Sequence, residues 1–241
     1  MAIVRNIDGF TACQPGDPLS KIDLGNIRKW AIHFEDFLNY DITQVVGGNA
    51  YTFTATNCVD TIAGPTGLLV LTLGGADNDT GQLQITSAPF QTNGKKLYFE
   101  IKLNLTLATG TVAANEIYVG LAGLQTTTNF VNAGGTALTA DNFMGFTKFD
   151  TQSKYNACLR ASDVESTDIG VSATITDTVD TTLAFYYDGL DVYFYENQAL
   201  IARLNNNIPT AIMSPVIVVK AGEAKANILK VDYVLVAAER A

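Results

Sequence analysis

The stretch from residue 181 to 204, TTLAFYYDGLDVYFYENQALIARL, constrains the possible folds more than any other part of the chain. It is rich in β-branched and aromatic residues, and its apolar side chains alternate, as at Leu183, Phe185 and Tyr187. Such alternation indicates a strand with one buried face, and the Asp188-Gly189 dipeptide after it is typical of a tight hairpin turn. A three-stranded meander alone is marginally stable in water, so this stretch requires a second apolar layer. We therefore expect a β-sandwich.

Strand patterns recur through the rest of the chain, separated by turn residues such as Asn93-Gly94. We expect strands at residues 51–56, 67–73, 81–87, 97–107, 116–122, 143–149, 155–161, 171–177, 215–220 and 227–237. The stretch 97–107, LYFEIKLNLTL, alternates most strictly, so Phe99 and Ile101 should face the core while Glu100 faces outward. Helical patterns between the strands are missing, which predicts an antiparallel all-β sandwich and disfavours a parallel α/β fold.

Three segments are less regular. Residues 30–40, WAIHFEDFLNY, fit both a strand and a helix, and we favour a strand because Gly47-Gly48 and a new alternating stretch follow. Strict alternation is broken in the strand at 227–237, which indicates a bulge. Residues 1–30 contain scattered glycine and proline without a sustained period, so we expect an extended N-terminal arm, either floppy or ordered against another molecule. A single sandwich domain, residues 31–241, is expected to follow the arm.

Charge and cysteine content limit the possible partners and compartments. The formal net charge is −9, from 24 acidic and 15 basic residues, which argues against nucleic acid because phosphate binding needs concentrated Lys and Arg. No apolar run approaches the roughly 20 residues that cross a bilayer, and the first residues lack the features of a signal peptide. We therefore expect neither membrane contact nor export. Cys13, Cys58 and Cys158 are far apart, and we expect buried free thiols, with an interchain disulfide as the alternative.

The residues available for catalysis are few. His33 is the only histidine, and its apolar neighbours are typical of a structural side chain. No serine lies in a GxSxG elbow, and no lysine lies in a phosphate-binding loop. Sandwich glycosidases use two nearby carboxylates, and their ExDxxE signature does not occur here. Glu100 and Glu116 are on separate expected strands and could approach each other, but any sheet protein offers such pairs, so we expect no enzymatic activity.

Asp77, Asn78 and Asp79, within GGADNDTGQ, form the best candidate metal site. Closely spaced oxygen ligands on a loop suit Ca²⁺. The spacing is not that of an EF-hand, however, and the same residues are common in ordinary turns. No other cofactor is expected.

Four tyrosines of the meander are candidates for a binding surface: Tyr186, Tyr187, Tyr193 and Tyr195. Alternation turns half of them toward the core. The others would form either an aromatic platform for sugar or a subunit interface, and we favour the interface.

Several segments resemble known proteins. KKLYFEIKLNL (95–105), EIYVGLAG (116–123), LAFYYDGLDVYFYENQAL (183–200) and ANILKVDYVLV (226–236) resemble the jelly-roll sandwiches of the laminin G and concanavalin type. Together with HFEDFLNYD (33–41) and LTLGGADNDTGQLQ (71–84), they resemble structural proteins in the virions of tailed bacteriophages. The likeness runs from Trp30 to the C-terminus and is more specific for fold than for role.

The resemblance implies a non-enzymatic virion component, assembled in the host cytoplasm. Its expected role is head decoration, as a cement protein that binds the major capsid protein and sister subunits, often as a homotrimer. Residues 1–30 and one face of a sheet would supply these contacts. The alternative is a lectin-like module of a tail or fibre that binds host glycan through loops such as residues 126–140 at the sandwich edge.

Overall fold

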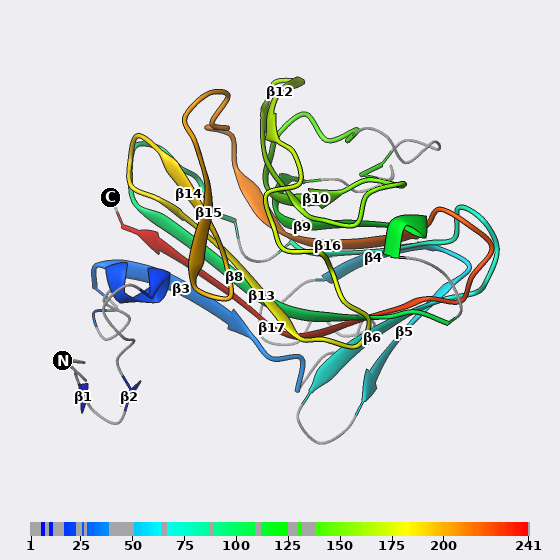
Figure 1. Ribbon diagram of the computed structural model, residues 1–241. Helices are drawn as coiled ribbons and strands as arrows, with labels where there is room; N and C mark the ends of the chain where they lie inside the picture. The colour runs from blue at the N-terminus through cyan, green and yellow to red at the C-terminus, as the bar shows by residue number, and fades with distance from the viewer. Residues whose placement is uncertain are drawn as a thin grey trace.

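Two stacked β-sheets make up most of the molecule. The computed structural model describes residues 6–7, 10–11, 17–22, 26, 28–38, 51–63, 67–86, 89–108, 112–124, 130–131 and 138–240. All strand pairings in these ranges are antiparallel (Figure 1). The only helices described are two short 3₁₀ turns, η1 (Pro18–Lys21) and η2 (Val112–Ala114). The expected antiparallel all-β sandwich is therefore confirmed.

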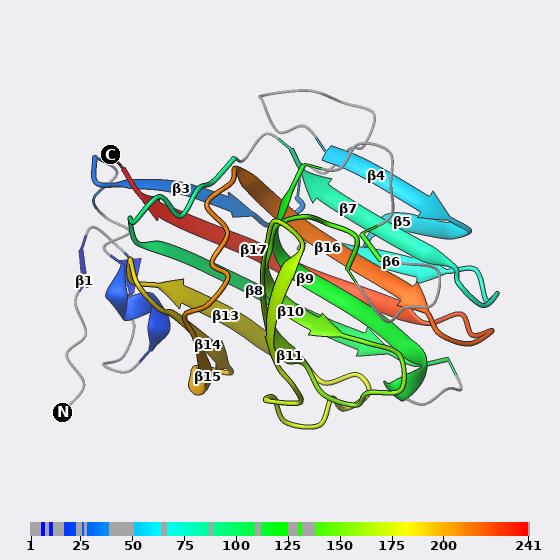
Figure 2. The same ribbon diagram turned by 90° about the horizontal axis from the view of Figure 1, so that it is seen from above.

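The first sheet has seven strands. Their order is β12 (Val164–Asp168), β11 (Asn156–Ala161), β10 (Phe143–Lys148), β9 (Asn115–Gly123), β16 (Met213–Ala221), β7 (Thr80–Ile85) and β4 (Tyr51–Thr56). Figure 2 shows β9 in the middle of this sheet, between β16 and β10. Strands β11 and β12 rise steeply from the plane of β9 and β16, so the sheet is curved (Figure 1).

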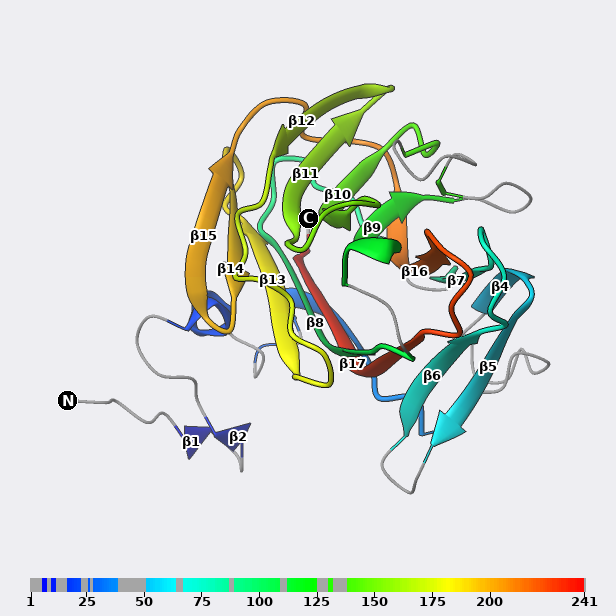
Figure 3. The same ribbon diagram turned by 45° about the vertical axis from the view of Figure 1, so that its right-hand side comes forward.

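The second sheet has eight strands. Seven follow the order β15 (Ala199–Leu204), β14 (Val192–Glu196), β13 (Thr181–Tyr187), β8 (Leu97–Thr106), β17 (Ile228–Glu239), β6 (Leu68–Leu73) and β5 (Cys58–Ala63). The eighth, β3 (Trp30–Glu35), pairs with the later half of β17, beyond the part that pairs with β6. At one side of the sandwich, β15 of this sheet lies beside β11 and β12 of the other (Figure 3).

Aromatic and aliphatic side chains from both sheets fill the space between them. Phe99 of β8 stacks on Phe185 of β13, with ring centroids 5.1 Å apart. Phe194 of β14 contacts Phe146 of the opposite sheet edge-on, at 5.4 Å. Burying such a side chain contributes about 1.5–3 kcal/mol before conformational entropy is charged against it. The apolar side chains that alternate along residues 97–107 and through the meander thus pack the two sheets together.

The turns and the bulge are also where the sequence suggested. Gly189 has φ of +109°, a value that residues with a Cβ rarely adopt, in the turn between β13 and β14. The next turn places two residues without that freedom, Asn197 and Gln198, at φ of 47° and 71°. In β17 the pairing register with β8 shifts between Val231 and Tyr233, which confirms a bulge in this strand.

One expected strand is wrong, and two strands of the main sheets were not expected. Residues 171–177 lie outside the sheets, and their backbone groups bond elsewhere: Ile175 donates to Ser153 at 2.9 Å and Ala173 to the Glu196 carboxylate at 2.7 Å. Strands β5 and β12 were missed because both are edge strands, and their many exposed residues hide the apolar alternation.

The N-terminal residues are described only in part. A separate two-stranded sheet pairs β1 (Asn6–Ile7) with β2 (Phe10–Thr11), and residues 17–22 lie against the eight-stranded sheet. The division into an arm of residues 1–30 and a sandwich of residues 31–241 stays a prediction. Segment 30–40 is a strand as far as Glu35, and residues 39–50 lie outside the described residues.

Two further sequence expectations have a structural counterpart. Cys58 and Cys158 are buried free thiols, as expected, whereas Cys13 lies outside the described residues. Neither of the described helices has the length and hydropathy needed to span a membrane.

Candidate functional site

The outer face of the seven-stranded sheet combines burial with unusual polar chemistry. On its central strand β9, Ile117, Val119 and Leu121 belong to the core between the sheets. Because neighbouring residues in a strand point to opposite sides, Glu116 and Tyr118 lie on the outer face. Both are nevertheless buried, with 1% and 0% of their surface exposed.

A segment of the chain covers this face. Residues 130–131 and 138–140, here called the covering segment, contribute apolar side chains that pack on the sheet. The cluster contains Phe130, Val131, Leu138 and Ala140 from the covering segment and Tyr118, Ala122, Phe143, Cys158, Val216 and Val218 from the sheet. The N–H of Phe130 donates to the side-chain oxygen of Gln82 at 2.9 Å, and Val131 pairs with Leu138 in an antiparallel bridge. The covering segment therefore excludes water from the centre of the face.

Two glycines meet under the covering segment. Gly120 of β9 lies directly opposite Gly145 of β10, and a Cβ built on Gly145 would come within 2.3 Å of the Val119 oxygen. The same Cβ would lie 3.0 Å from the Phe143 ring, so that ring lies over the glycine. Glycine at these two positions allows the close approach of β9 and β10.

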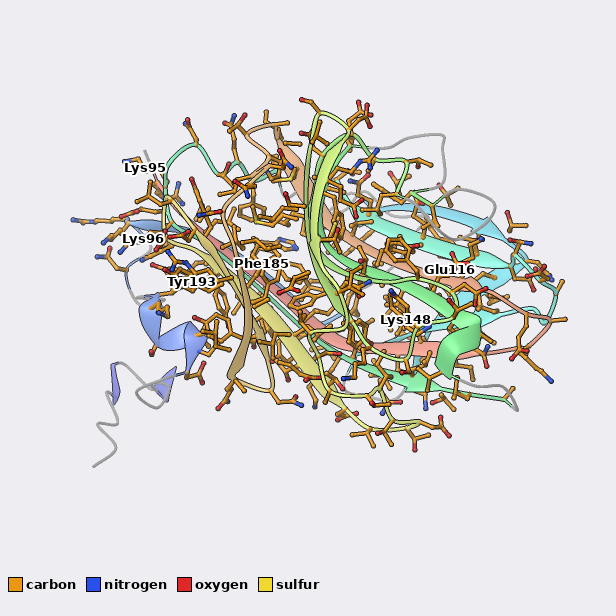
Figure 4. The ribbon with its side chains drawn as sticks, turned by 45° about the horizontal axis from the view of Figure 1, so that its top comes forward. Lys95, Lys96, Glu116, Lys148, Phe185 and Tyr193 are labelled. Carbon is orange, nitrogen blue, oxygen red and sulfur yellow. The ribbon has the colours of Figure 1, made fainter. Side chains whose placement is uncertain are left out.

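An ion pair lies at the end of the face where β9 begins. Lys220 of β16 donates to Glu116 at 3.2 Å, and both side chains are almost fully buried. Burial raises the pKa of Glu116, and Lys220 opposes that shift. Lys148 of β10 lies near the same end of the sheet (Figure 4), but its register with the core residue Ile117 places its side chain on the inner side of the sheet. Burial lowers the pKa of Lys148 to about 8. The Lys148 amine donates to the backbone oxygens of Asn115 and Phe149.

Four polar atoms on this face are buried and have no hydrogen-bond partner among the described residues. They are Oε2 of Glu116, the hydroxyl of Tyr118, Nε of Arg160 and Oγ of Ser214. Glu116 and Tyr118 lie toward one end of β9, while Ser214 and Arg160 lie toward the other, in register with Ala122 and Phe143. At about 3.3 Å per residue, the span from Glu116 to Ala122 is roughly 20 Å. The face thus offers both donors and acceptors along most of a strand.

On the opposite face of the sandwich, the central charged side chains Glu100 and Lys102 are both paired. The hydroxyls of Tyr98 and Tyr233 both donate to the Glu100 carboxylate, the latter at 2.6 Å. Lys102 forms ion pairs with Asp232 at 2.9 Å and Asp180 at 3.2 Å. Glu100 and Glu116 therefore lie on opposite outer faces, and the expectation that they could approach each other is wrong.

The tyrosines of the meander do not form an exposed platform. Tyr187 points into the core, and its hydroxyl donates to the Gly189 oxygen at 2.8 Å. Tyr186 and Tyr195 lie on the outer face but are only 5% and 6% exposed, because Ile22 and Trp30 pack over them. Tyr193 alone among the four is half-buried on that face.

The candidate calcium residues lie in the turn between β6 and β7. The Asp79 carboxylate is buried and accepts hydrogen bonds from the Ala76 N–H at 2.7 Å and from the Asn57 amide at 3.0 Å. Asn78 adopts φ of 67°, while Asp77 is exposed. Among the residues that the structure describes, no group of three His, Cys, Asp or Glu is placed to hold a metal ion. Calcium at these three residues stays a prediction.

His33 and the loop at residues 126–140 also have positions to report. His33 lies on β3, its Nε2 is buried without a partner among the described residues, and burial lowers its pKa. Of the loop that we expected at the sandwich edge, residues 130–131 and 138–140 lie over the seven-stranded sheet instead. Residues 126–129 and 132–137 lie outside the described residues.

Comparison with known proteins identifies the fold. No protein-family model matches the chain, and no curated protein sequence matches it. Among solved structures, the metal-free carbohydrate recognition domain of Emp46p is similar with a TM-score of 0.58 and 10% identity, covering 84% of this chain and 94% of that one. Peanut lectin with a bound nonapeptide has a TM-score of 0.52 and 12% identity, covering 87% and 97%. The chain has a concanavalin-like jelly-roll fold.

The jelly-roll neighbours include enzymes as well as lectins. An endo-1,3-beta-glucanase from Streptomyces sioyaensis has a TM-score of 0.59 and 15% identity, covering 87% of this chain and 96% of that one. The Emp46p domain was also solved in a potassium-bound form. At these identities the likeness concerns the fold alone, so the neighbours do not decide whether this chain is an enzyme or holds a metal ion.

Sequence reasoning missed most of the residues on this face. Glu116 was considered only as a partner of Glu100, and Lys220, Arg160 and Ser214 were not considered. The alternation of Glu116, Tyr118 and Gly120 on one strand was a usable signal, because a single face would then carry an acid, a phenol and bare backbone.

Proposed function

We propose that this chain is a non-enzymatic, lectin-like module that binds carbohydrate on the outer face of its seven-stranded sheet. The carrying observation is the set of four buried polar atoms without a partner among the described residues. Each such group costs about 1–3 kcal/mol when it is left unsatisfied. Saccharide hydroxyls both donate and accept, so they can satisfy a carboxylate, a phenol and a guanidinium alike.

The dimensions and the cover of the face support an elongated ligand. The polar atoms are distributed over most of β9, which suits a saccharide of several rings better than a single ring. Tyr118 is buried beneath the covering segment, so Phe130 and Leu138 must move aside for a sugar to reach it. The described contacts of Phe130 and Leu138 with the sheet are apolar, apart from the hydrogen bond that the Phe130 N–H donates to Gln82. A sugar ring that stacks on Tyr118 and Phe143 would replace such apolar contacts.

The carboxylates of this face support binding without hydrolysis. Glycosidases place two carboxyl groups about 5–9.5 Å apart on either side of the bond that is cleaved. Here Glu116 is held in a buried ion pair. Glu165 lies on β12, three strands away, or roughly 14 Å across the sheet at about 4.8 Å per strand, and in register with Ala122 at the other end of β9. Burial and the charge of Asp150 both raise the pKa of Glu116. The Asp150 carboxylate itself accepts a hydrogen bond from the Thr151 N–H at 2.9 Å.

A glycan array tests this function. The wild-type chain should bind a subset of oligosaccharides, and Glu116→Gln and Tyr118→Phe should each weaken that binding about tenfold, as expected for a lost hydrogen bond of roughly 1.4 kcal/mol. Tyr98→Phe, on the opposite face, is the matched control and should bind normally. The array is run with and without calcium, and Asp79→Asn reports whether the β6–β7 turn matters. Absence of binding, or release of reducing sugar, would contradict the proposal.

We also propose a second role, based on the sequence resemblance: head decoration in a tailed-bacteriophage virion, with the major capsid protein and sister subunits of a homotrimer as partners. Exposed apolar side chains at and just after β3 support an assembly surface, because Phe34 and Leu38 are 56% and 53% exposed. Antibody labelling of purified particles under the electron microscope tests the location. Labelling of tails, or of no part of the particle, would count against decoration, and normal occupancy of a Phe34→Asp variant would count against this surface.

A further inference from the structure

Residues 17–22, here called the strap, lie against the outer face of the eight-stranded sheet. Asp17 starts η1 by accepting the Leu19 N–H at 2.9 Å. Ile22 is buried in an aromatic cluster on this face, and Leu19 packs against the same cluster. The strap therefore covers tyrosines that the strands β8, β13 and β14 present outward.

A lysine of the strap lies over two tyrosine rings. The Lys21 ammonium is 5.3 Å from the ring centroid of Tyr186 and 5.7 Å from that of Tyr193. The two rings are roughly parallel, with centroids 6.5 Å apart. Lys21 is exposed and forms no ion pair with a described residue, so the rings supply its contacts.

A second cation reaches the same tyrosine from another element. The Arg203 guanidinium of β15 lies 5.6 Å from the Tyr193 centroid and pairs with Asp191 at 2.6 Å. Burial, followed by the charges of Asp188 and Glu239, raises the pKa of Tyr186. Positive side chains from two separate parts of the chain thus gather on this ring pair, in a field to which carboxylates contribute.

We propose that Tyr186 and Tyr193 form a binding site for a lysine side chain at the end of a short 3₁₀ turn of a partner protein, and that the strap occupies this site in cis. The strap shows the pattern that fits, with an apolar residue two positions before the lysine and another directly after it. A partner that offers the same pattern with additional contacts displaces the strap. This site is on the opposite face from the carbohydrate face and does not depend on it.

Peptide binding to the full-length chain tests the proposal. The probe is a fluorescent peptide with the sequence of residues 17–22, compared by anisotropy with the same peptide carrying alanine in place of its lysine. A Leu19→Asp/Ile22→Asp variant, which releases the strap, should bind the lysine peptide at least tenfold more tightly than the wild type does. Adding Tyr193→Ala to that variant should abolish the gain, and the alanine peptide should bind neither protein.

Equal binding of the lysine peptide to the wild type and the released variant would overturn the proposal, as would equal binding of the two peptides. Circular dichroism melts establish that each variant remains folded. Should the released variant unfold, Lys21→Ala is the alternative, because it removes only the competing ammonium, and it should bind the lysine peptide at least threefold more tightly than the wild type does. Unchanged affinity of Lys21→Ala would then overturn the proposal.

Discussion

The two outer faces of the sandwich differ in how completely their polar side chains are hydrogen-bonded. On the eight-stranded sheet, Glu100 accepts hydrogen bonds from two tyrosine hydroxyls, and Lys102 has two acidic partners. On the seven-stranded sheet, one oxygen of Glu116 and the hydroxyl of Tyr118 have no partner among the described residues, although both side chains are buried. Two residues of β3 are exceptions in the eight-stranded sheet, because the indole nitrogen of Trp30 and Nε2 of His33 lack a described partner.

This contrast separates a face whose central charged side chains are paired from a face on which four buried polar atoms lack a described partner. Both faces are covered by the chain itself, one by the strap and the other by the covering segment. Cover alone therefore does not distinguish structure from function. The two faces differ in whether the polar groups beneath the covering residues have hydrogen-bond partners, because a buried polar group without one is costly.

The largest difference between the faces is expected from their ion pairs. Lys220→Met leaves Glu116 buried without its cation and should lower the free energy of unfolding by about 3–5 kcal/mol. Lys102→Met breaks pairs with partly exposed acids and should cost about 0–1 kcal/mol. Urea denaturation measures both. Equal losses would mean that the two faces are similarly hydrated, and the contrast would disappear.

The glycine pair should give the next largest effect. Gly145→Ala places a Cβ 2.3 Å from the Val119 oxygen and 2.7 Å from the Gly120 Cα, so β9 and β10 must separate. We expect a loss of about 2–4 kcal/mol, in the range of overpacked sites. Gly123→Ala, also on β9, is the control, because the nearest atoms would be 4.0 Å away, and it should change stability by about 0.5 kcal/mol or less. A stable Gly145→Ala protein would argue against the close approach.

The stability contributions of Lys148, which is buried on the inner side of the seven-stranded sheet, and of Lys102, which is partly exposed on the outer face of the eight-stranded sheet, should respond to pH in opposite directions. Burial lowers the pKa of Lys148 from 10.5 to about 8, so between these values the unfolded chain holds a proton that the folded chain does not. Stability should therefore rise with pH in this window, by up to about 3 kcal/mol from this residue. The partners of Lys102 raise its pKa, so its contribution is complete below the unfolded value and is lost as the pH rises through the folded one.

Denaturation curves between pH 7 and pH 10 measure the contribution of Lys148, because proton binding is linked to the free energy of unfolding. The difference between the wild type and Lys148→Met should grow with pH, whereas Lys102→Met should retain the wild-type rise. A constant difference for Lys148→Met would show that its amine is charged throughout.

The smallest expected effects come from single hydroxyl groups. Tyr98→Phe removes a donor from the Glu100 carboxylate and should cost about 1.5–3 kcal/mol. Tyr118→Phe removes a hydroxyl that has no described partner, and it should change stability by less than about 1 kcal/mol in either direction. Thermal unfolding of the two variants compares the faces directly. A large loss for Tyr118→Phe would mean that its hydroxyl is already satisfied.

The sandwich was predictable because its signal is local. Alternation in residues 97–107 and in the meander predicts which side chains face inward. Phe99, Phe185 and Phe194 do meet in the core. Residues 171–177 show the limit of that signal. They alternate like a strand, yet their N–H groups bond to loop and side-chain oxygens, which only the tertiary structure supplies.

The candidate face was far less predictable. Glu116 meets Lys220 only through the register of β9 against β16, which joins residues about a hundred positions apart and leaves no trace in either local pattern. The burial of Tyr98, which alternation assigns to the outside, likewise depends on neighbours from the strap and from β13. Period-two patterning indicates the side on which a residue lies, but not what later covers that side.

Strand β17 has a consequence for how the protein is made. It is a central strand of the eight-stranded sheet and pairs with β8 along one edge and with β6 and β3 along the other. Because it comes after all three in the sequence, a nascent chain emerging from the ribosome exposes their unpaired edges until residue 239 has been synthesised. Those edges are open to pairing with neighbouring nascent chains during that time. Translation speed and chaperone supply should therefore influence the yield of this protein.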